Sequence, residues 1–198
     1  MAKILIIAKK ITPTTVLLAK SLIEQQHIVI LLTSQKSLEK SELKDINLPH
    51  LQLMEYFKTW SLLEGLKILP VLMTLQAQIV HFIVDEEKIT LTERMLATFF
   101  KDLRSTVLAT TVLKLELNLK TQKNLRKLLE ESDIITGPSI DVLAQLRGMN
   151  TRNQKQIRGV LSPLNIIDPL VFNTNTESEF PLIQLLQKVK IRPQEPQL

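Results

Sequence analysis

The polar side chains that could do chemistry follow apolar, strand-like runs of the sequence. Lys9 and Lys10 come directly after the run Lys3–Ala8, and Thr12 stands before Pro13 at a helix-start pattern. Lysine ammonium groups beside the free N–H groups of a helix N-terminus can hold an anion. The pattern therefore predicts a candidate anion site at Lys9, Lys10 and Thr12. Two solvated loop lysines are the alternative interpretation.

Two further strand ends carry polar groups. Asp85 follows the run QIVHFIV and opens the acidic triplet Asp85–Glu87, which suits a general base, a metal-binding carboxylate or, more simply, charge stabilisation of a helix N-terminus. Ser139 follows DIIT in the segment TGPSI, which is not the G-x-S-x-G pattern of a nucleophile elbow. Ser139 is expected to cap a helix that runs through Leu146 and to lie at the same sheet edge as the other candidates.

The remaining titratable candidates give no catalytic or metal centre. His81 lies inside an apolar strand, where a histidine is either a hydrogen-bonded core residue or a ligand-binding group. His27 and His50 have no metal-ligating neighbours at suitable spacing, and the chain has no cysteine for a thiolate site, a disulfide or a cysteine nucleophile. We therefore predict no catalytic residue, no metal and no cofactor.

The composition limits the classes of ligand and partner that the chain is expected to bind. The four glycines are scattered along the 198 residues, so neither G-x-G-x-x-G nor a P-loop is present. The net charge is +5, and the acid-free stretch between Asp141 and Asp168 carries four basic residues. That stretch is a solvated face or a patch for an anionic partner. Nucleic acid is not expected, because aromatic residues are 4% of the chain and none interrupts the basic stretch to stack on bases.

The alternation of elements predicts the fold. Apolar runs of strand length are expected at 3–8, 27–33, 48–56, 78–84, 106–113, 133–136 and 158–161. Helical patterns are expected at 13–24, 61–75 with a break or kink at Pro70, 91–103, 121–131 and 139–146. The strands lack polar alternation, as strands covered on both faces do. The sequence thus predicts an α/β, Rossmann-like doubly wound, mainly parallel sheet with helices on both faces.

The order of these segments resembles the N-terminal, acceptor-side domain of type-B-fold glycosyltransferases, particularly the large retaining family 4. The opening KILIIAKK followed by TPTTVLLAKSLIEQQHIVILLT is similar to that family's first strand, helix and second strand. AQIVHFIVDEE resembles its D-V-V-H-x-H-D strand, with His81 at the first His position. STVLATTVLKLE, SDIITGPSIDVLAQLRGM and RGVLSPLNIIDPLVF resemble its later segments, so the resemblance runs from Lys3 to about Phe172.

The departures from the family shape the expected function. The first loop reads Lys10-Ile11-Thr12-Pro13 where the family has a glycine pair, and Leu113 or its neighbour stands where the family has a histidine near the transferred sugar. The chain also lacks the family's second domain, which binds the nucleotide sugar. The resemblance therefore implies a non-catalytic binding or partner module. The alternative is the acceptor-binding subunit of a split glycosyltransferase that transfers a sugar from a nucleotide sugar.

The sequence also predicts how the chain is divided into a domain and a C-terminal tail. Residues 1–172 form the glycosyltransferase-like domain, and residues 173–198 form a polar linker, a short apolar helix near 181–189 and a proline-rich tail. That helix is expected to dock on a partner chain with the donor domain, or to mediate self-association. The N-terminal apolar run is too short for a signal peptide, so we expect a cytoplasmic protein. The apolar segment 60–75 is core or interface, with peripheral contact to the inner face of a membrane as the alternative.

Overall fold

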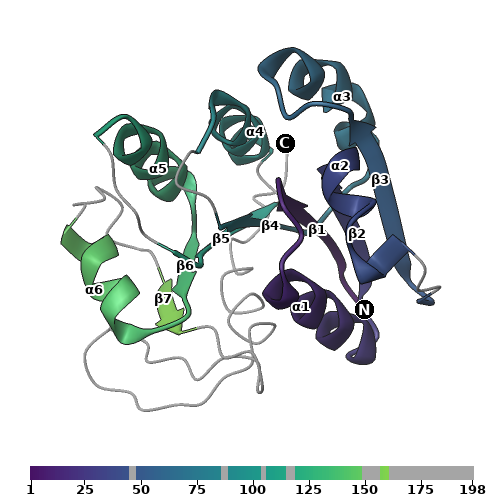
Figure 1. Cartoon of the computed structure of the whole chain (residues 1–198), viewed down its shortest axis with the longest axis horizontal. Helices are drawn as coiled ribbons and strands as arrows, with labels where there is room; N and C mark the ends of the chain where they lie inside the picture. Colours follow the sequence, from purple (N-terminus) through teal and green to yellow (C-terminus); the bar gives the residue numbers. More distant parts are fainter. Residues whose placement is uncertain (45–47, 86–88, 104–105, 115–118, 149–156, 161–198) are drawn as a thin grey trace, which may run out of the picture.

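The structure is a computed structural model that describes residues 1–44, 48–85, 89–103, 106–114, 119–148 and 157–160. Its centre is a seven-stranded sheet in the order β3-β2-β1-β4-β5-β6-β7, in which every neighbouring pair is parallel (Figure 1). The strands are β1 (Lys3–Ala8), β2 (Ile28–Ser34), β3 (Leu51–Phe57), β4 (Ile79–Val84), β5 (Val107–Val112), β6 (Ile134–Gly137) and β7 (Ile157–Val160). This is the doubly wound, Rossmann-like fold that the sequence predicts.

Helices connect successive strands. They are α1 (Pro13–Glu24), α2 (Gln35–Leu38), α3 (Leu62–Thr74), α4 (Leu91–Asp102), α5 (Leu119–Glu131) and α6 (Ile140–Gly148), with a short 3₁₀ turn at Glu42–Lys44. Each predicted helix is present with ends shifted by a few residues, whereas α2 and the 3₁₀ turn were not predicted. The helix α3 is one continuous element through Pro70.

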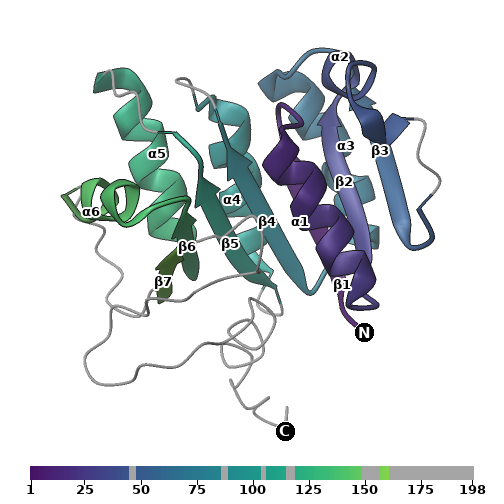
Figure 2. The ribbon, with the colours of Figure 1, turned by 60° about the horizontal axis from the view of Figure 1, so that its bottom comes forward.

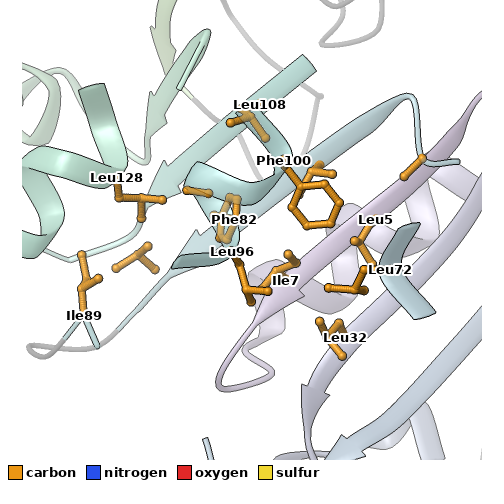
Figure 3. Packing of buried hydrophobic residues seen from close by; sticks show 14 of the residues in the cluster. Leu5, Ile7, Leu32, Leu72, Phe82, Ile89, Leu96, Phe100, Leu108 and Leu128 are labelled. Atoms are coloured by element: carbon orange, nitrogen blue, oxygen red, sulfur yellow. The ribbon is translucent and has the colours of Figure 1, made fainter. Parts of the chain in front are cut away.

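The strands are buried on both faces, which explains their unbroken apolar sequences. On one face, β-strand residues pack with Leu72 of α3, Phe100 of α4, Leu128 of α5 and Leu146 of α6. Figure 3 shows part of this cluster, with Phe82 of β4 among residues of α4. On the other face, a second cluster joins the sheet to α1 and to the segment after β2 (Figure 2). The two layers of helices fix the sheet rigidly between them.

The strand order reverses between β1 and β4. From β1 the chain proceeds outward through β2 to β3, and it then returns to β4 on the other side of β1. In doubly wound sheets, ligands bind beyond the carboxyl ends of the strands at this switch point. The residues that follow Ala8 and Val84 therefore occupy the position at which this fold most often holds a ligand.

Four expectations lie outside the described residues. These are the linker and tail at 173–198, the end of the first domain up to residue 172, the four basic side chains between Asp141 and Asp168, and Glu86 and Glu87 of the acidic triplet. Among the helices that the structure describes, none is both long and apolar enough to cross a membrane.

Candidate functional site at the β1–β4 switch point

A small open pocket lies at the switch point. Lys9 and Lys10 approach it from the end of β1, and Asp85 approaches it from the end of β4, with Glu93 of α4 beside them. Its apolar lining comes from Ile83, Val84 and Ile89. The free volume is about 20 Å³, which is room for about one water molecule. The pocket is thus lined by two lysines and two acidic residues at the edge of the sheet.

The loop between β1 and α1 is fixed by hydroxyl groups at the end of β2 and in α2. The Oγ of Ser34 donates a hydrogen bond to the carbonyl oxygen of Lys9 at 3.0 Å. The N–H of Ile11 donates to Ser37 Oγ at 2.7 Å. These two contacts hold the backbone of Lys9 and Lys10 at the pocket, where Lys9 is half-buried and Lys10 is exposed.

The backbone N–H groups at the N-terminus of α1 are mostly hydrogen-bonded within the helix itself. Thr12 and Thr15 form a reciprocal capping box, in which each side-chain oxygen accepts from the other residue's N–H at 3.2 Å. Val16 N–H donates to the Thr12 carbonyl, and Pro13 has no N–H. At most the N–H of Thr14 is left for a ligand. Thr12 is therefore a helix cap, and the helix N-terminus adds little to the anion site expected beside the two lysines.

Glu93 is the buried carboxyl group of the pocket. It is 7% exposed, and its Oε2 accepts hydrogen bonds from both the N–H, at 2.9 Å, and the hydroxyl of Thr90. The bond from the Thr90 N–H is part of the capping box of α4. Burial raises the pKa of Glu93, while the bonds from Thr90 and the positive charge of Lys9 oppose that rise.

His81 is a core residue and does not line the pocket. It is 1% exposed, and its Nε2 is 2.6 Å from Thr111 Oγ1, which is in turn 2.6 Å from Thr136 Oγ1. This row crosses β4, β5 and β6 inside the sheet. Burial lowers the pKa of His81 to about 4, so the ring is neutral at pH 7. Its Nδ1 has no hydrogen-bond partner among the described residues.

Ser139 also serves the fold. Its Oγ accepts a hydrogen bond from Val142 N–H at 3.3 Å, which caps α6 as the sequence predicts. It stands after β6, two strands away from β4 in the sheet order. Of the six predicted ligand-binding residues, the structure brings Lys9, Lys10 and Asp85 together at one pocket. It leaves Thr12, His81 and Ser139 outside the lining of that pocket.

Sequence reasoning missed Glu93. The pattern Thr90-x-x-Glu93 is a capping-box signature before an apolar helix, and it would have located this carboxyl group at the start of α4. Since α4 follows β4, that start lies at the carboxyl edge of the sheet. Among the described residues, no group of three or more His, Asp or Glu side chains is arranged to hold a metal ion.

Comparisons with known proteins support the fold. No protein-family model matches the chain, and no curated protein matches it. Among solved structures, it is similar to the Bordetella bronchiseptica enzyme WbmH in complex with NAD+, with a TM-score of 0.52 and 11% identity. The match covers 69% of this chain and 55% of the WbmH chain, so this chain spans about half the length of that protein. It also matches phenylacrylic acid decarboxylase from Aquifex aeolicus with a TM-score of 0.47 and 16% identity, over 78% of this chain and 99% of that one.

Proposed function

We propose that this chain is a Rossmann-like binding domain without catalysis of its own, similar to the acceptor-side domain of a type-B-fold glycosyltransferase. Its ligand is a small molecule that carries both an anionic group and hydroxyl groups, such as a sugar phosphate. The observation that carries the proposal is the meeting of Lys9 and Glu93 at one pocket of the switch point.

The chemistry of the lining favours this ligand class. The ammonium groups of Lys9 and Lys10 suit a phosphate or carboxylate, and charge-assisted hydrogen bonds to such groups are the strong ones. The carboxyl groups of Asp85 and Glu93 suit sugar hydroxyls, which donate to carboxylate oxygens. A ligand with only negative groups would face repulsion from these acids, so a mixed ligand fits better.

A dinucleotide such as the NAD+ of WbmH fits this loop poorly. Segment 9–15 has no glycine, so side chains stand where a pyrophosphate would need close backbone approach. The capping box of α1 also uses the N–H groups that would hold phosphate oxygens.

Calorimetric titration of matched variants tests the location of the site. Lys9→Ala is expected to weaken binding of glucose 6-phosphate roughly tenfold, because it removes a charge-assisted bond worth at least about 1.4 kcal/mol. Lys123→Ala removes an exposed lysine on α5 and serves as the control, with no expected change. Equal affinity in both variants would contradict a site at the switch point.

The absence of catalysis has its own test. The purified chain is expected to release no free nucleotide when it is incubated with UDP- or GDP-sugars and glucose 6-phosphate. Turnover of either donor by the chain alone would contradict the proposal.

The exposed edge favours one second candidate, the acceptor-binding subunit of a split glycosyltransferase. Lys10 is exposed and the pocket opens at the sheet edge, where a donor domain on another chain would have access to the bound acceptor. Affinity isolation of the full chain from its own cells, followed by mass spectrometry and a nucleotide-sugar assay, distinguishes the two. A second Rossmann-like chain with joint transferase activity favours the split enzyme, and isolation without one favours the binding domain.

A further inference from the structure

Exposed apolar side chains gather on α3 and at the start of α4. Five of the seven large hydrophobic side chains that are exposed in the described part of the chain lie there: Leu62, Leu63, Leu66, Met73 and Leu91. Leu63 and Met73 are 72% and 58% exposed. Contiguous apolar surface of this kind marks an interaction site more often than scattered single residues do.

The packing of α3 directs this surface away from the domain. Its buried face consists of Gly65, Ile68 and Leu72. A Cβ atom at Gly65 would lie 2.7 Å from Met95 Cε and 3.0 Å from Thr92 Cγ2, so the glycine permits close approach of α3 to α4. In Figure 1 the two helices are neighbours, with α3 at the periphery of the molecule. The opposite face of α3 is therefore open along its length.

The spacing of the apolar residues on this open face suits packing against a second helix. Leu63, Leu66, Pro70 and Met73 form what we call the α3 stripe, with intervals of three, four and three residues. That is the a/d repeat of a two-helix coiled coil. The intervals read the same from either end. An antiparallel copy centred at the height of residue 68 therefore places Leu63 opposite Met73 and Leu66 opposite Pro70.

Backbone chemistry in the stripe favours a protein over lipid. Pro70 lies inside α3 and has no N–H, so the carbonyl of Leu66 lacks its intrahelical donor on the exposed side. Hydrocarbon tails offer no donor to that carbonyl. In the antiparallel arrangement, Lys67 of the second copy lies at nearly the same height as this carbonyl and can donate to it.

The charges of α3 also favour a protein partner over lipid. Its charged residues are Glu64 and Lys67, which cancel, whereas a helix that lies on an anionic membrane usually carries a basic polar face.

We propose that the α3 stripe is a self-association surface, which pairs α3 with the antiparallel α3 of a second copy of this chain about a two-fold axis. A 13-residue helix is about 20 Å long, so the contact is at the small end of specific interfaces even with Leu91 at its margin. The dimer is accordingly weak and depends on protein concentration.

Sedimentation velocity of the full chain over a range of concentrations tests the surface. We expect a monomer–dimer equilibrium, and Leu66→Glu is expected to raise the dimer dissociation constant roughly tenfold or more. Leu17→Glu is the matched control, because Leu17 on α1 is 45% exposed and Leu66 is 48% exposed. A monomer at all concentrations overturns the proposal, and so does a dimer that both variants weaken equally or that Leu66→Glu leaves intact.

Cysteine cross-linking tests the register, since the chain has no native cysteine. The double variant Leu63→Cys/Met73→Cys is expected to form a disulfide-linked dimer under mild oxidation, and Leu63→Cys alone is not. Efficient cross-linking of the single variant would overturn the antiparallel register. Binding of the monomeric chain to phosphatidylcholine/phosphatidylglycerol vesicles that Leu66→Glu abolishes would assign the stripe to a membrane and overturn self-association.

Discussion

Glu93 and His81 are two buried titratable groups near the same strand end, and they differ in what surrounds them. Glu93 lines an open pocket, is held by Thr90 and feels the charge of Lys9. His81 lies inside the sheet, where its Nε2 lies within hydrogen-bond distance of Thr111 Oγ1, which in turn bonds to Thr136. Burial favours the neutral form of both groups. The comparison shows that a shifted pKa marks burial, and that access to a pocket distinguishes a candidate ligand-binding group from a core residue.

The largest expected effect comes from His81. Its unfolded-state pKa is near 6.5 and its folded-state pKa is about 4, so the unfolded chain binds a proton first as the pH falls and stability declines below about pH 6.5. Between pH 7 and pH 5 this decline amounts to about 2 kcal/mol. His81→Gln removes the titration and keeps an amide for Thr111. Urea unfolding at both pH values is expected to show a decline smaller by that amount, and an unchanged decline would contradict the burial of a neutral ring.

The two helix caps at the switch point give the next effect. Thr90→Ala and Thr12→Ala each remove an N-cap, and each is expected to cost about 1 kcal/mol. The loss at Thr90 is expected to be larger at neutral pH, because Glu93 also loses a hydroxyl donor there. Urea unfolding of both variants at pH 7 and pH 4 measures this. An equal change in the two stability losses between pH 7 and pH 4 would contradict this expectation, because it would mean that the Thr90 hydroxyl does not stabilise the charged form of Glu93.

The smallest expected effect comes from Glu93 itself. Because burial raises its folded-state pKa, the folded chain holds the proton longer than the unfolded chain, and stability falls as the pH rises through that range. Glu93→Gln keeps an acceptor for Thr90 and does not ionise. It is expected to unfold at slightly higher urea concentration than the parent at pH 7 and at the same concentration at pH 4. If Glu93→Gln were less stable than the parent at pH 7, the expectation would be wrong, because the folded chain would then stabilise the charged carboxylate of Glu93.

The fold was largely predictable from the sequence, and the reasons are local. Runs such as KILIIA and QIVHFIV are apolar without alternation because both faces of these strands are buried, and this same property identifies a parallel sheet. For α3 the sequence predicted a break or kink at Pro70, and the structure excludes the break. The helix runs through Pro70, with Ile68 and Leu72 buried and Pro70 on the exposed side.

The candidate site was predictable only in part. Lys9, Lys10 and Asp85 could be placed together because the carboxyl ends of parallel strands share one edge. The sequence could not decide whether Thr12 caps a helix or binds a ligand, because a threonine hydroxyl at this position can do either. The partners of His81 lie 30 residues away at Thr111 and further on at Thr136, so they depend on strand register, which one sequence does not reveal.

A side-by-side calorimetric titration of the unmodified chain with glucose 6-phosphate and with NAD+ tests the central claim most directly. The account predicts that the sugar phosphate binds at the β1–β4 switch point and that NAD+ produces no saturable heat, because the loop before α1 offers no glycine cradle and few free N–H groups. Saturable binding of NAD+ with no binding of the sugar phosphate would contradict it.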